Sequence, residues 1–175
     1  MPPRWRGLPA GPLWPYIHSV TGIDSLLVFD RAVLRQRRER AARDWQPRAF
    51  LKREIASRLV DRLDDVRRTF ASALDLGSHG DEFATALAGR KTVDWLVRAD
   101  LGHGFARLAH GPAIVADEEF LPFAPASFDL VVSAMDLHWV NDLPGTLVQI
   151  RRILRPDGLA EAITRRVGEV GATSV

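Results

Sequence analysis

The feature that most constrains the fold is a change of hydrophobic period near residue 73. Beyond it, short apolar runs alternate with segments in which apolar residues recur every three or four positions. The apolar runs cover residues 73–77, 93–100, 112–117 and 128–135, and a helical segment at 143–154 follows the last of them. Strands that alternate with helices at this spacing predict an α/β fold in which crossover helices connect parallel strands.

Two further helices are expected before residue 73. Asp30 is placed to cap the first, at 30–45, and the second covers 50–66 with one apolar face. The first 23 residues are rich in proline and glycine, which disfavours regular structure. Residues 1–28 are therefore predicted to form a flexible leader, with a targeting segment as the alternative.

Composition excludes several classes of protein. The chain has no cysteine, so it can form neither disulfides nor thiolate metal sites, and no metal is expected. A net charge of only +2 gives little support for a nucleic-acid partner. No apolar stretch reaches the roughly 18 residues of a membrane span. The arginine run (Arg35, Arg37, Arg38, Arg40 and Arg43) is read as a solvated helix face, with a nucleic-acid or protein contact as the alternative.

Acidic residues stand where three of the predicted strands end. Asp75 lies in the first strand, which ends at Gly77, and Asp100 ends the second. Asp117 ends the third, and Glu118 follows it. Ligands of open α/β sheets bind beyond the carboxyl ends of the strands. Taken singly, each acid could be solvated and the glycine could serve only a turn, but together they predict a nucleoside site, with a carboxylate for the ribose and another for an exocyclic amine.

Longer motifs resemble a known family. The segments ALDLGSHGDEFATAL, ADEEFLPFAPASFDLVVSAMDLHWVNDL and LRPDGL are similar to class I methyltransferases of the "type 11" group. Together with FDRAVLRQRRERAA, they more closely resemble the branch that holds methyltransferase-like assembly factors of respiratory complex I and malonyl-carrier-protein methyltransferases. The resemblance covers residues 29–159 and implies a Rossmann-like sheet that binds S-adenosylmethionine. Four of its parallel strands should follow the order 3-2-1-4, with helices on both faces.

The resemblance also implies roles for individual residues. Asp75 and Gly77 would lie beside the methionine part of the cofactor, Asp100 at the ribose, and Asp117 and Glu118 at the adenine, against which Phe120 and Leu121 could pack. The expected cofactor-binding residues are Asp75, Gly77, Ser78, His79, Gly80, Asp100, Leu101, Asp117, Glu118 and Met135. His138 and Trp139 are expected either to contact substrate or to pack in a helix-capping loop. No catalytic residue can be named.

The sequence departs from the family pattern at two places. The family turn reads DLGxGxG, whereas here His79 replaces the middle glycine and Asp81 the last. His79 either points outward or crowds the methionine carboxylate, so weak cofactor binding is expected. The second departure follows LRPDGL, where residues 160–175 form a divergent tail without a sustained apolar run. We therefore expect a sheet truncated after the fourth parallel strand and its following helix, although residues 162–167 could form a poor edge strand.

Three functions remain open from the sequence. The first is a methyltransferase that acts on a small acid, a carrier-bound acyl group or a protein side chain. The second is an assembly factor that binds a respiratory complex I subunit, because the eukaryotic members of this branch are associated with arginine hydroxylation rather than methylation. The third is an inactive truncated product. The expected location is the cytoplasm for a bacterial protein and the mitochondrial matrix for a eukaryotic one.

Overall fold

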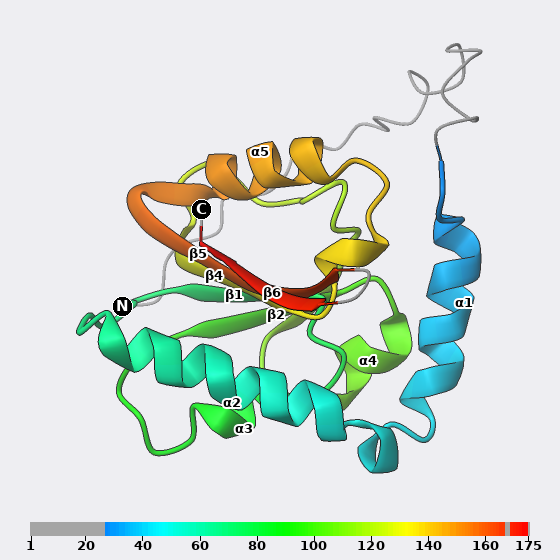
Figure 1. Cartoon of the computed structure of the whole chain (residues 1–175), viewed down its shortest axis with the longest axis horizontal. Coiled ribbons are helices and arrows are strands. Elements are labelled where there is room, and N and C mark those ends of the chain that lie inside the picture. The colour runs from blue at the N-terminus through cyan, green and yellow to red at the C-terminus, as the bar shows by residue number, and fades with distance from the viewer. Residues whose placement is uncertain (1–26, 167–168, 175) are drawn as a thin grey trace.

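The computed structural model describes residues 27–166 and 169–174, so nearly all of the expected leader lies outside the described residues. Helices and strands alternate along the described chain (Figure 1). In order they are α1 (Arg31–Ala42), the 3-10 helix η3 (Gln46–Arg48), α2 (Phe50–Asp65), β1 (Ala73–Leu76), α3 (Glu82–Ala86), β2 (Leu96–Asp100), α4 (His103–Leu108), β3 (Ala113–Val115), β4 (Phe128–Ala134), the 3-10 helix η4 (Leu137–Trp139), α5 (Leu143–Ile153), β5 (Leu154–Arg166) and β6 (Glu169–Ser174).

The first two helices are held in different ways. α1 begins where expected, because the Asp30 side chain accepts hydrogen bonds from the backbone N–H groups of Ala32 and Val33. Only Leu34, Arg38 and Ala42 are buried along it. α2, in contrast, buries a continuous apolar stripe against the sheet: Ile55, Ala56, Leu59, Val60 and Leu63.

The described strands form one sheet in the order β3-β2-β1-β4-β5-β6. The strands from β3 to β5 run parallel, which confirms the α/β class and the 3-2-1-4 order of the first four. Figure 1 shows α5 on one side of the sheet and α2 with α3 on the other. Alternate residues of β4 therefore enter two different cores. Val131 lies in the core beneath α5, and Leu130 and Val132 lie in the core beneath α2.

The chain does not stop forming sheet after β4. β5 pairs parallel with β4, from Phe128 with Leu154 to Ala134 with Ile163, and β6 pairs antiparallel with β5. β4 therefore has a fifth strand beside it, where the sequence predicted at most a poor edge strand at 162–167. The physical reason is that Ala160 and Ile163 supply the apolar contacts, while the buried Glu161 forms an ion pair with Arg62 of α2 at 3.0 Å.

Candidate functional site

The carboxyl edge of the parallel strands brings the predicted residues together. The turn after β1, the end of β2 and the segment after β3 all lie at this edge, because the three strands are parallel neighbours. Asp75, Asp100 and Glu118 are each no more than 1% exposed, and Leu101 is fully buried. These three acids are therefore buried and not solvated, whereas Asp117 is half-buried.

The turn after β1 is tightly folded around its glycine. Gly77 adopts a φ of +69°, and a Cβ atom there would collide with the carboxyl group of Asp136, which follows β4. The N–H groups of Gly77 and Ser78 both donate to the carbonyl of Ala99 in β2. Gly80 donates its N–H to Glu82 at 3.1 Å. This turn therefore satisfies its own amides within the protein.

His79 points inward, so the outward orientation is not the one found. Its ring lies 5.2 Å from that of Trp45 and 4.9 Å from that of Phe105, between centroids. Its Nδ1 lies 3.0 Å from the Lys52 ammonium, and its backbone N–H donates to Asp100 at 2.9 Å. Burial and the neighbouring Lys52 charge hold the pKa of His79 well below its ordinary value, so the ring is neutral.

Arg38 of α1 is the central cation of the site. Its guanidinium lies 2.9 Å from Glu118 and 3.3 Å from Asp100, and it also donates to Asp136. The three acids come from three different strand ends, and the arginine itself is only 3% exposed. Burial opposes ionisation of Arg38, but Asp136, Asp100 and Glu118 outweigh it and raise its pKa. Arg38 thus bonds the carboxylates expected at the ribose and the adenine.

Arg31, the first residue of α1, binds the remaining acid, Asp117. It donates to Asp117 at 2.5 Å and also to Glu118, and its Nη1 donates to the carbonyl of Trp139 at 3.1 Å. Of the two apolar residues expected against a flat ring, Leu121 is buried in the core beneath α5, and Phe120 is 64% exposed. Leu121 therefore does not face this site.

Lys52 and Asp75 form a second buried charged group. The Lys52 ammonium donates to the carbonyls of Gly77 and Ala134, the latter at 2.8 Å. Burial lowers the pKa of Lys52, although Asp75 and Asp136 oppose the shift. Burial raises the pKa of Asp75 to about 7, and both of its carboxyl oxygens lack a hydrogen-bond partner. Burial also raises the pKa of Asp136 well above its ordinary value.

The segment after β4 closes the site from the side of α1. Met135 adopts a φ of +56° and is half-buried, and its N–H donates to the carbonyl of Ile163. His138 and Trp139 lie in η4, and the Trp139 ring meets that of Phe29 at 5.4 Å. Trp139 therefore packs beneath the start of α1.

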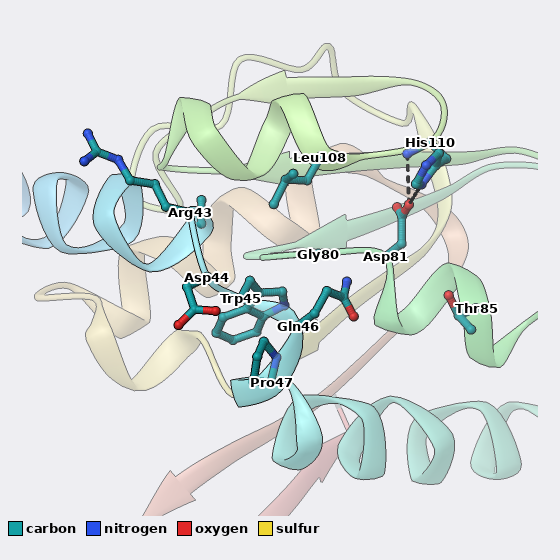
Figure 2. Close-up of a pocket in the computed structure, with 11 residues that line it drawn as sticks. Arg43, Asp44, Trp45, Gln46, Pro47, Gly80, Asp81, Thr85, Leu108 and His110 are labelled. Atoms are coloured by element: carbon teal, nitrogen blue, oxygen red, sulfur yellow. Dashed lines mark hydrogen bonds and ion pairs between the residues drawn. The ribbon is translucent and has the colours of Figure 1, made fainter.

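A cavity of about 430 Å³ lies beside the turn that follows β1 (Figure 2). It is bounded by the end of α1, by η3, by Gly80 and Asp81 of the turn, and by Leu108. Figure 2 shows the Trp45 ring on its wall and His110 bonded to Asp81 on the other side. None of Asp100, Asp117 or Glu118 lines this cavity, so it adjoins the turn and not the acids.

Four charged residues of the site were missed from the sequence: Arg31, Arg38, Lys52 and Asp136. The arginine run was read as a solvated face, which is correct for Arg35 and Arg37 but wrong for Arg38. Arg38 is four residues from Leu34 and four from Ala42, so its place on the buried stripe of α1 was the available sign.

Within the described part of the chain, no cluster of three potential metal ligands occurs. The described helices also include none that is both long and apolar enough to cross a bilayer.

The sheet order, the glycine turn and the strand-end acids define a Rossmann-like domain of the methyltransferase type. A family described as "Methyltransferase domain" matches residues 74–161, which is half of the chain. The chain belongs to this family, the S-adenosylmethionine-dependent class I methyltransferases.

Two kinds of relative share this sequence. The human protein "Arginine-hydroxylase NDUFAF5, mitochondrial" is 42% identical over 142 residues, which cover 77% of this chain and 41% of that protein. The "Malonyl-[acyl-carrier protein] O-methyltransferase" of Methylovorus sp. (strain MP688) is 33% identical over 146 residues, or 75% of this chain and 49% of that protein. The chain therefore spans less than half the length of either relative.

Solved structures share the fold. A chain of the Haloferax volcanii complex that contains the Trm112 methyltransferase activator has a TM-score of 0.61 at 21% identity, covering 73% of this chain and 59% of its own. Haemonchus contortus phosphoethanolamine N-methyltransferase 1, in complex with phosphoethanolamine and S-adenosylhomocysteine, gives 0.61 at 19% identity, covering 77% and 32%. At these identities the likeness is one of fold.

Proposed function

We propose that this chain is a cofactor-binding domain for S-adenosylmethionine in a methyltransferase-type enzyme. The observation that carries the proposal is the meeting of the β1 turn with the acids that follow β2 and β3 at one edge of the sheet. Asp100 would accept from the ribose hydroxyls, Asp117 and Glu118 would face the adenine, and Asp75 and Gly77 would lie beside the methionine part.

The residues present fit this cofactor in chemical type. The unpartnered oxygens of Asp75 and Asp136 are buried acceptors suited to a positively charged ligand. When bound, the cofactor supplies a methyl group already activated by its sulfonium. The protein's own task is to bind, orient and exclude water, and no general base is required of it. The acceptor would be a small acid, a carrier-bound acyl group or a protein side chain.

The test is direct binding. Asp100→Ala should weaken binding of S-adenosylmethionine by about 1–3 kcal/mol, because the ribose hydroxyls lose their acceptor. Asp94→Ala, at an exposed position just before β2, is the matched control. Calorimetry measures both, with circular dichroism to confirm folding, since Asp100 also holds the N–H groups of His79 and Gly102. An unchanged affinity in the Asp100 variant would exclude the ribose role.

A second candidate function is a respiratory complex I assembly factor, with arginine hydroxylation or subunit binding in place of methyl transfer. Two observations favour it: the 42% identity to a mitochondrial arginine hydroxylase, and His79 where the family has glycine. A matrix location would accompany this function, and a cytoplasmic one would accompany the first. Mass spectrometry of candidate protein acceptors distinguishes the two, because methylation adds a methylene mass and hydroxylation adds an oxygen.

A further inference from the structure

The strand-end acids already have a cationic partner inside the protein. Arg38 contacts Asp100, Glu118 and Asp136 together, and Arg31 contacts Asp117. Both arginines belong to one helix, α1. The guanidinium groups and a nucleoside compete for these carboxylates. A lone pair that accepts from an arginine cannot at the same time accept from a ribose hydroxyl or from the adenine amine.

The helix that carries these arginines is weakly held by apolar contacts. Its buried apolar residues are Leu34 and Ala42, each 9% exposed, whereas α2 buries Ala56, Leu59, Val60 and Leu63 completely. A cavity of about 220 Å³ is lined by one face of α1, including Val33 and Leu34, and by Trp139. α1 is therefore attached by its ion pairs with the site and by its contact with α4, where Gly104 donates its N–H to Glu39.

In Figure 1, α1 lies along one end of the molecule, beside α4. A helix in this place can leave the site without breaking any strand pairing, because it pairs with none of the strands. The charges that hold it are those that a nucleoside would take over. Exchange of one set of partners for the other would keep Asp100, Asp117 and Glu118 hydrogen-bonded in both states.

We propose that α1 is a strap that closes the nucleoside site, and that the ion pairs of Arg38 hold it closed. Cofactor binding and α1 attachment then exclude each other, so the cofactor enters only when α1 is released. This inference rests on the proposed function, since it concerns access to the same acids. It assigns Arg38 a positioning role in the closed form, and none in the transfer itself.

Hydrogen exchange of the whole chain, with S-adenosylhomocysteine as the probe, tests the strap without any activity measurement. Saturating probe should speed exchange of the amides in residues 31–42 and slow exchange in the β1 turn. Slower exchange in 31–42 with the probe bound would overturn the proposal, because α1 would then close over the ligand.

Two variants give an independent readout by calorimetry. Arg38→Met should lower the Kd for S-adenosylhomocysteine at least ten-fold, because the competing cation is gone. Arg35→Met removes the same charge from an exposed position of α1 and should leave the Kd unchanged. An Arg38→Met affinity equal to or weaker than that of the unchanged protein would overturn the strap and leave the proposed function standing.

A failure of the proposed function would give a different calorimetric result from a failure of the strap. If neither the unchanged protein nor Arg38→Met binds the probe, the nucleoside site itself is rejected, and the strap with it. If Arg38→Met does not fold, the exchange experiment on the unchanged protein still decides, because it needs no substitution.

Discussion

His79 combines an unfavourable backbone with favourable packing. Its φ of +57° lies in the left-handed region, which costs an L-residue roughly 1–2 kcal/mol and a glycine almost nothing. Its ring offsets this cost through contacts with Trp45 and Phe105. The family's middle glycine would thus fit this backbone without strain, and it would leave the space beside Lys52 open.

We predict that His79→Gly strengthens binding of S-adenosylmethionine by about ten-fold, or 1.4 kcal/mol. The reason is that the ring occupies space at the turn and the glycine adopts the left-handed conformation freely. His79→Ala is the matched control, since it removes the ring but keeps the backbone cost. Titration calorimetry measures all three proteins, and equal affinities would show that the ring does not obstruct the ligand.

β5 shows why the tail was misread. Its sequence carries charged residues and no long apolar run, so a central strand was not expected after residue 159. The structure makes the strand possible by pairing the buried Glu161 with Arg62, a residue 99 positions earlier. No local pattern could reveal that partner. The strands from β1 to β4, in contrast, followed from their own apolar runs, and their order followed from the family resemblance.

Loss of β5 packing should therefore be costly. Ile163 is 5% exposed and lies in the core beneath α2, so Ile163→Ala should lower the free energy of unfolding by about 2–4 kcal/mol. Val148→Ala, at a 69% exposed position on α5, should change it by less than about 0.5 kcal/mol. Urea denaturation followed by circular dichroism measures both. Equal midpoints for the two variants would mean that β5 contributes little to the fold.

At the scale of the whole molecule, the sequence predicted the first four strands and the acids at the ends of β1, β2 and β3, but neither Asp136 nor the cations that neutralise the acids. Arg38 and Glu118 are 80 residues apart, and only the folded chain brings them together. The buried charges remain unequal, because the buried acids Asp75, Asp100, Glu118 and Asp136 outnumber the buried cations of the cluster, which are Arg38, Lys52 and Arg98. Burial is the main cause of the raised pKa values of Asp75 and Asp136, and neighbouring acids add to it while the buried cations oppose it.

Burial of Asp75 makes folding stability depend on pH. The pKa of Asp75 rises from 3.8 to about 7 on folding, so the stability it contributes is complete below pH 3.8 and is lost as the pH rises to about 7. Asp75→Asn should therefore raise the free energy of unfolding at pH 8 by roughly 2–4 kcal/mol, and by little at pH 4.

Asp94→Asn, which alters an exposed carboxylate, is the control for the loss of one negative charge. Thermal melts of the three proteins at pH 4, 6 and 8 give the comparison. A difference between Asp75→Asn and the unchanged protein that stays constant from pH 4 to 8 would contradict the raised pKa.

The position of Arg38 among three acids also limits the rate at which a ligand associates with the site. A ligand that must wait for a buried guanidinium to leave cannot bind faster than that departure, however concentrated the ligand is. The observed association rate should therefore rise with ligand concentration and then level off at the opening rate of α1. In stopped-flow experiments, Arg38→Met would remove the plateau, and the rate would stay proportional to concentration up to the diffusional limit.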